Sequence, residues 1–192
     1  MGALGNGLSS ADHYVEALSV REAELSMLRR IVIDDAEEDI LEVQANLAIT
    51  YGNLGRLEEA LQMKREVYAG HLKRDGEEHH HTLIAALNYA AALPGAKRFK
   101  EAKSLLRKAM PVARRVLGES HGVTLRVMWN YARAVCQDPG ATLDDLREGV
   151  TTLEDAERIA RRVLGGAHPL TSAIEGDLRN ARTVLSARQE LS

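Results

Sequence analysis

The sequence predicts an all-α solenoid built from antiparallel helix pairs. Its outline repeats at a fixed interval, because Asn46, Asn88 and Asn130 lie 42 residues apart, as do Gly76 and Gly118. A fixed period in this range is the signature of a solenoid. Hydrophobic residues make up 45% of the chain but aromatic residues only 4%. Ala and Leu therefore carry the apolar content, which favours closely packed helices over sheets.

Charge and cysteine content exclude several classes of protein. The 192 residues include 25 Lys and Arg against 28 Asp and Glu, a net charge of −3. This balance gives no general attraction to nucleic acid or to an anionic membrane. Cys136 is the only cysteine, so an intrachain disulfide is impossible and a reducing compartment fits. With no apolar run of about 18 residues, we expect a cytoplasmic protein without a membrane partner.

The chain divides into a lead-in, a half repeat, three repeats and a capping helix, about eight helices in all. Glu16-Ala17 sits where Glu59-Ala60 sits later, so the first segment resembles the second half of a repeat and the chain is expected to be a fragment of a longer protein. The expected bounds are a flexible lead-in at 1–10, an array at 11–192, and within it a half repeat at 11–38, repeats at 39–81, 82–123 and 124–170, and a capping helix at 171–192.

Apolar spacing and helix breakers define each pair. In repeat one, Gly52-Asn53-Leu54-Gly55 separates two helices, since Gly and Asn tolerate the left-handed turn that ends a helix. Pro94-Gly95 plays that part in repeat two. Pro111 falls inside the second helix of that repeat and predicts a kink or an early break there. In repeat three, five residues are inserted near the CQDPGAT turn, and Thr142 with Asp145 predicts a capping arrangement.

The string N-L-A-x-x-Y-x-x-x-G-R-x-x-E-A, from Asn46 to Ala60, resembles tetratricopeptide repeats. The longer period and the closing G-x-x-H-P-x-T, complete at His168-Pro169, resemble the kinesin light chain subtype. This resemblance implies a right-handed superhelical solenoid whose first helices line a concave groove. It also implies close helix contact at three pairs of small residues: Ala48 with Ala60, Ala90 with Ala102, and Ala132 with Gly149. One position departs from the family pattern: the tyrosine expected there is present in repeat one as Tyr51, but repeats two and three have Leu93 and Val135 instead.

Helical spacing identifies the side chains that would face this groove. The candidate peptide-binding residues are Asn46, Asn53, Asn88, Arg126, Trp129, Asn130 and Arg133. Further positions on the same face are Glu42, Ala45, Ile49, Ile84, Leu87, Ala91, Gln137, Asp177 and Asn180. The three repeated asparagines form a ladder that can grip a peptide backbone, because an amide offers both donor and acceptor. Alternatively, they bond to neighbouring helices and only hold the stack.

Trp129 lies between Arg126, Asn130 and Arg133 and is the best candidate for a binding hot spot. Arg pairs well with carboxylates, so an acidic or C-terminal peptide segment of a protein partner would suit this cluster. Alternatively, Trp129 fills the space between repeats as a core residue.

No metal, cofactor or catalytic site is predicted. Three consecutive histidines, at 79–81, cannot all face one ion in a regular helix, and His79 recurs as His121 and His168, which indicates a structural place at a helix start. Phosphate-loop, dinucleotide, zinc-protease and nucleophile-elbow motifs are missing, and Cys136 has no neighbouring base in sequence.

We therefore expect a binding scaffold rather than an enzyme. The alternatives are a structural subunit or spacer of a larger assembly, and a regulatory sensor array of a longer multidomain protein. An exposed terminal half repeat could also pair two copies end to end.

Overall fold

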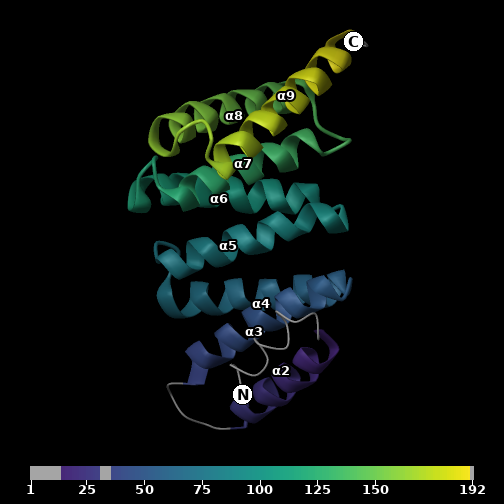
Figure 1. Ribbon diagram of the computed structural model, residues 1–192, viewed down its shortest axis with the longest axis vertical. Coiled ribbons are helices and arrows are strands. Elements are labelled where there is room, and N and C mark those ends of the chain that lie inside the picture. Colours follow the sequence, from purple (N-terminus) through teal and green to yellow (C-terminus); the bar gives the residue numbers. More distant parts are fainter. Residues whose placement is uncertain (1–13, 31–35, 191–192) are drawn as a thin grey trace. The chain divides into compact units, whose positions relative to one another are not determined.

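The computed structural model describes residues 14–30 and 36–190, which form eight α-helices, one 3₁₀ helix and no strand (Figure 1). This confirms the predicted all-α solenoid of helix pairs. The predicted lead-in at 1–10 lies outside the described residues. The helices are α2 (Tyr14–Leu28), α3 (Ala36–Asn53), α4 (Leu57–Asp75), α5 (His80–Ala92), the 3₁₀ helix η1 (Leu93–Ala96), α6 (Phe99–Leu117), α7 (Gly122–Cys136), α8 (Leu143–Leu164) and α9 (Pro169–Glu190).

The chain divides into two compact units, and the boundary between them in the sequence falls between Gly76 and Glu77. In the first unit, α3 packs against both α2 and α4. Leu18 and Leu25 of α2, Leu47 of α3 and Ala60 of α4 belong to one buried apolar cluster. Burial of these side chains is the main term that holds the three helices together.

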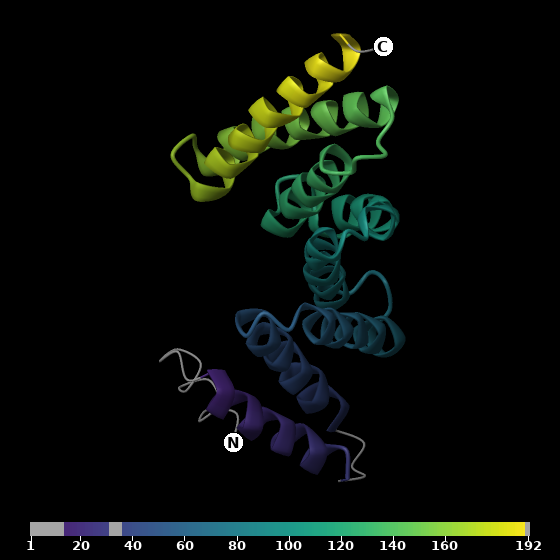
Figure 2. The same ribbon diagram turned by 90° about the vertical axis from the view of Figure 1, so that its right-hand side faces the viewer.

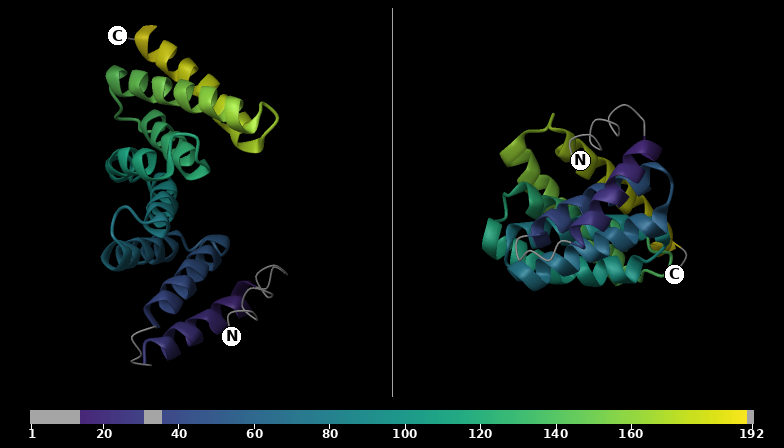
Figure 3. Two further views of the ribbon diagram at one scale, coloured as in Figure 1. Left: turned by 90° about the vertical axis from the view of Figure 1, so that its left-hand side faces the viewer. Right: turned by 90° about the horizontal axis from the view of Figure 1, so that it is seen from below.

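In the second unit, each helix packs against the next one from α5 to α9, and α5 also contacts α7, which in turn contacts α9 (Figure 2). The first helices of successive pairs therefore form a continuous row. Leu106 and Tyr131 lie in a cluster formed by α5, α6 and α7. Leu153 and Ile174 lie in a second cluster formed by α7, α8 and α9, where α8 and α9 run side by side (Figure 3).

Small residues allow the helices of each pair to approach closely. All six positions named from the sequence are buried, with Ala102 and Ala132 at 0% exposure. At Gly149 the approach is close, because an added Cβ would lie 2.9 Å from Cys136 Sγ and 3.3 Å from Val135 Cγ1. A larger residue at position 149 would therefore force α7 and α8 apart.

The repeated histidines begin helices, as their spacing predicted. His79 and His121 are the N-caps of α5 and α7, and the Nδ1 atom of each accepts the backbone N–H two residues later, at 3.4 and 3.2 Å. His168 makes the same bond to the N–H of Leu170 at 3.1 Å. These bonds satisfy backbone donors that a helix start leaves without a partner in the helix.

In two helix pairs, α5 with α6 and α7 with α8, a tyrosine of the first helix bonds to the second helix. The sequence did not reveal these bonds. Tyr89 and Tyr131 lie 42 residues apart, and each donates its hydroxyl to a glutamate near the start of the next helix, Glu101 and Glu148 respectively. Tyr131 Oη also accepts a bond from Arg107 Nη2 at 2.6 Å. The two glutamates therefore hold the start of α6 against α5 and the start of α8 against α7.

The connection between α7 and α8 contains the five inserted residues and is fixed at several points. Lys103 Nζ of α6 lies 3.0 Å from Asp138 Oδ2, and Asp138 Oδ1 accepts the N–H of Gly140 at 2.9 Å. Thr142 and Asp145 form the predicted capping box at the start of α8. The inserted segment is thus a defined turn.

The expectation of an early break at Pro111 is wrong, since α6 continues through it to Leu117. Proline removes one backbone hydrogen bond, but Pro111 is exposed. The buried residues Leu106, Ala109 and Ala113 anchor the helix on both sides of it. Their packing outweighs the lost bond.

Candidate functional site

Two neighbouring pockets lie along the row formed by α5, α7 and α9. The larger pocket has a volume of about 400 Å³ and is lined by Ala91, Pro94, Gly95, Phe99, Asn130, Arg133 and Gln137. The smaller pocket has a volume of about 170 Å³ and is lined by Arg133, Cys136, Gln137, Leu153, Asp177, Asn180, Ala181 and Val184. Arg133 and Gln137 of α7 border both pockets, so a single extended ligand could contact the two together.

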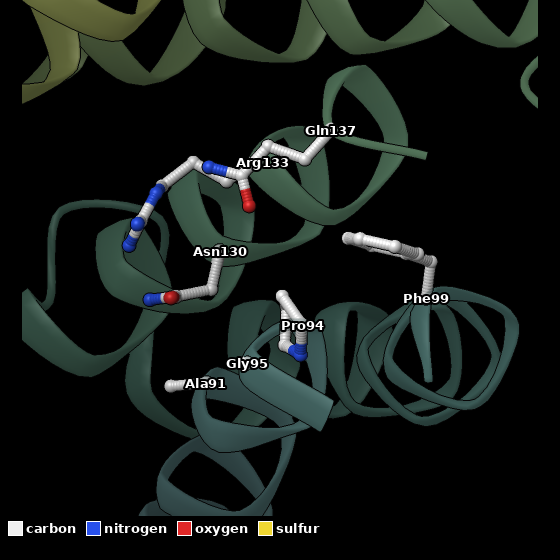
Figure 4. A pocket seen from close by; sticks show the side chains of 7 residues that line it. All are labelled: Ala91, Pro94, Gly95, Phe99, Asn130, Arg133 and Gln137. Atoms are coloured by element: carbon white, nitrogen blue, oxygen red, sulfur yellow. The ribbon is translucent and has the colours of Figure 1, made fainter. Parts of the chain in front are cut away.

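The apolar wall of the larger pocket depends on how the chain leaves α5. The 3₁₀ helix η1 places Pro94 at its start, and its first residue, Leu93, is fully buried. Lys97 then adopts a left-handed conformation with φ of 58°, which reverses the chain so that Phe99 begins α6. Figure 4 shows the Phe99 ring on one side of the pocket and Asn130 on the other. The pocket therefore faces an aromatic ring on one side and polar groups of α7 on the other.

Asn130 retains hydrogen-bonding capacity within the larger pocket. Its Nδ2 donates to the backbone oxygen of Arg126 at 2.9 Å. Among the described residues, its Oδ1 has no donor, and the nearby Gln137 is exposed. Both carboxamides can thus bond a ligand, and Arg133 is the one charged side chain that lines this pocket.

In the smaller pocket, an acidic side chain of α9 pairs with two groups of α7. Trp129 Nε1 donates to Asp177 Oδ2 at 2.7 Å, and Arg133 Nε lies 3.3 Å from the same oxygen. The Arg133 guanidinium also stacks over the Trp129 ring, with its carbon 5.1 Å from the ring centroid. These contacts hold the cation against the aromatic face and make the charge of this pocket nearly neutral.

Cys136 is half-buried and lines the smaller pocket. Burial is the main reason that its pKa rises to about 11, and the negative charge of Asp177 adds to the effect. A nucleophilic cysteine needs the opposite shift, because the thiolate is the reactive form. At neutral pH this thiol is therefore a weakly polar lining group.

The structure brings together only some of the predicted site residues. Asn130 and Arg133 line the pockets, and half-buried Trp129 is tied to Asp177 beside them. Asn88 of α5 and Arg126 of α7 are exposed and line neither pocket. In the first unit, α3 carries the two remaining predicted residues, the half-buried Asn46 and the exposed Asn53.

Several lining residues escaped the sequence analysis. These are Pro94, Gly95 and Phe99 in the larger pocket, and Cys136, Leu153, Ala181 and Val184 in the smaller one. Helical spacing along the first helices could not find them, because most come from turns or from second helices. The isolated position of Phe99, the only phenylalanine of the chain, was the one available signal.

Known proteins support the fold. A model of the tetratricopeptide repeat family matches residues 39–114, and no curated protein matches the chain. A kinesin light chain-type protein of Podosopora anserina with nearly identical TPR-like repeats has a similar structure, with a TM-score of 0.78, 23% identity, and coverage of 98% of this chain and 87% of that one. A single-substitution variant of that protein matches with a TM-score of 0.80, 23% identity, and coverage of 98% and 86%.

BtubC (BKLC) of P. vanneervenii has a similar structure, with a TM-score of 0.72 and 16% identity. The match covers 97% of this chain and 76% of BtubC. At such identities the likeness concerns the fold alone. Together with the family match, it confirms the tetratricopeptide character that the repeat pattern indicated. No helix among the described residues is long and apolar enough to cross a membrane.

Proposed function

Since this chain carries tetratricopeptide repeats, we propose that it is a protein-interaction scaffold that binds a peptide segment of a partner protein along α5, α7 and α9. The observation that carries the proposal is the pair of pockets that share Arg133 and Gln137. Concave sites that combine apolar walls with a few convergent polar groups are typical ligand sites. Here these groups project from a row of packed helices, which is a rigid support.

Carboxamides at the pockets suit the backbone of an extended peptide. Asn130, Gln137 and Asn180 each offer a donor and an acceptor, the pattern that a peptide unit also presents. Apolar walls such as Phe99 could then receive side chains. Recognition would thus combine backbone bonds, which are independent of sequence, with side-chain contacts that select one sequence.

An acidic peptide fits the larger pocket best. Arg133 lines it without an acidic neighbour among the lining residues, and the exposed Arg126 lies one helical turn before Asn130. Arg forms strong, directional bonds with carboxylates. Charge complementarity of this kind would mainly raise the association rate and the specificity.

We propose no chemical step for this site. The raised pKa of Cys136 disfavours a nucleophilic role, and a scaffold needs only surfaces. The free thiol also agrees with a reducing, cytoplasmic location.

A peptide array probed with the whole chain tests the proposal. Peptides that bind would be measured again with Asn130→Ala and Arg133→Gln, and with Arg158→Gln as the matched control, because Arg158 is exposed on α8 and pairs with Asp155. We expect each pocket variant to weaken binding at least about tenfold, or ~1.4 kcal/mol. The control should bind like the wild type, and circular dichroism should show equal helicity.

Two results would contradict the proposal. One is an array without any binding peptide, and the other is binding that survives both pocket substitutions. A role as a structural subunit or spacer would then explain the repeats of this chain better. The next experiment would be to purify the assembly that contains the chain.

A further inference from the structure

We infer that Asp177 makes the smaller pocket a subsite for an uncharged aliphatic side chain and directs anionic side chains of the same peptide to the larger pocket. This inference rests on the proposed peptide-binding function and names what each pocket selects. It depends on the position of one carboxylate, and it assigns to α9 a part in specificity.

The first step concerns the cation. Arg133 borders both pockets, so its charge could attract a ligand carboxylate to either one. On the side of the smaller pocket, Asp177 Oδ2 already lies 3.3 Å from Arg133 Nε and accepts the Trp129 N–H at 2.7 Å. An incoming carboxylate would therefore have to displace Asp177 from both groups, or approach it at the cost of like-charge repulsion.

The second step concerns the walls. Leu153 and Ala181 form a buried apolar floor, with 0% and 2% exposure, and Val184 stands at the rim. A volume of about 170 Å³ holds one side chain. An aliphatic group in this pocket would remove its own apolar surface, and that of the partly exposed Val184, from water, which is worth about 25 cal/mol per Å².

The third step concerns selection against charge. A carboxylate in this pocket would lose much of its hydration without gaining a free cation, and such a loss is unfavourable. The larger pocket is bordered by the same Arg133, still paired with Asp177 through Nε, but none of its own lining residues is acidic, so a ligand carboxylate there meets no carboxylate among the lining side chains. Specificity is a difference between affinities, and Asp177 supplies the repulsive part of that difference.

Cys136 provides an intrinsic probe, because it is the only cysteine and lines the smaller pocket. The experiment measures its labelling rate with N-ethylmaleimide and with a maleimide that carries a sulfonate group. The ratio of anionic to neutral rate cancels changes in thiolate fraction. Each ratio is normalised to the same reagents reacting with glutathione.

In Asp177→Asn, we expect this ratio to rise at least about threefold over the wild type at low salt, with the difference shrinking at high salt. Asp177→Glu should restore the wild-type ratio. Asp155→Asn is the matched control, since it removes an aspartate of α8 that pairs with Arg158 away from the pockets, and it should leave the ratio unchanged.

Asparagine can still accept the Trp129 N–H, so Asp177→Asn should fold, and emission from this single tryptophan verifies it. An unchanged ratio, or an equal rise in Asp155→Asn, would overturn the assignment of Asp177 even if peptides bind. Failure of every peptide to bind would overturn the proposed function without altering the ratio. The two failures are therefore distinguishable.

Discussion

Replacing Gly149 by alanine sets two opposing effects against each other. Within a helix, alanine is favoured over glycine by ~0.8–1.0 kcal/mol. At this position, however, the new Cβ would lie 2.9 Å from Cys136 Sγ and 3.3 Å from Val135 Cγ1. Overpacking of a close contact costs ~1–3 kcal/mol. The clash should therefore outweigh the propensity gain, and we expect a net destabilisation of ~1 kcal/mol.

The matched control is Gly176→Ala in α9, where no atom lies within 4 Å of the added Cβ. This variant should gain ~0.8 kcal/mol, so the two alanines should differ by ~2 kcal/mol. Urea unfolding followed by Trp129 emission reports on the unit that contains both sites. In a Cys136→Ala background, the cost of Gly149→Ala should shrink, which a double-mutant cycle measures. If Gly149→Ala stabilises as much as the control, the close approach of α7 and α8 is refuted.

Three further predictions concern single contacts. His121→Ala should destabilise the chain by ~0.5–2 kcal/mol through loss of an N-cap, and His121→Asn should restore most of it, as thermal unfolding would show. Tyr131→Phe removes a hydroxyl bonded to Glu148 and should cost ~1–2 kcal/mol in urea unfolding. Burial raises the pKa of Cys136 to about 11, so the folded thiol stays protonated where an unfolded one ionises, near about 8.5. The free energy of unfolding should therefore fall as pH rises from about 8.5 to about 11, and Cys136→Ser should abolish that part of the loss.

The sequence predicted the helices well because their signals are local. Periodic apolar residues, the glycines that end helices, and the Thr142–Asp145 capping box each depend on neighbours a few residues away. The recurrence of His121 identified a helix start, although histidine is outside the usual N-cap set. The early break expected at Pro111 does not occur, since the effect of this proline depends on which side of the helix faces solvent. That information is tertiary.

The site was predictable only where it follows helical spacing. Asn130 and Arg133 were found because they share one face of α7. Phe99 reaches the pocket through the left-handed turn at Lys97, and no periodicity in the sequence describes such a turn. The bond between Trp129 and Asp177 joins residues 48 positions apart. Sequence spacing placed both on the groove face without indicating that they pair.

The fixed turn after α7 bears on how repeat arrays lengthen. The interval from Gly118 to Gly165 is five residues longer than the interval from Gly76 to Gly118, yet α7 keeps its packing against α6 and α8. The extra segment is held by the ion pair of Lys103 with Asp138 and by a bond from Arg188 Nη2 to the oxygen of Pro139 at 2.8 Å. The longer connection between α7 and α8 thus leaves the packing of these helices intact. Pro139-Gly140, whose residues are exposed, is consequently a natural site for grafting an epitope or a small reporter domain into the array.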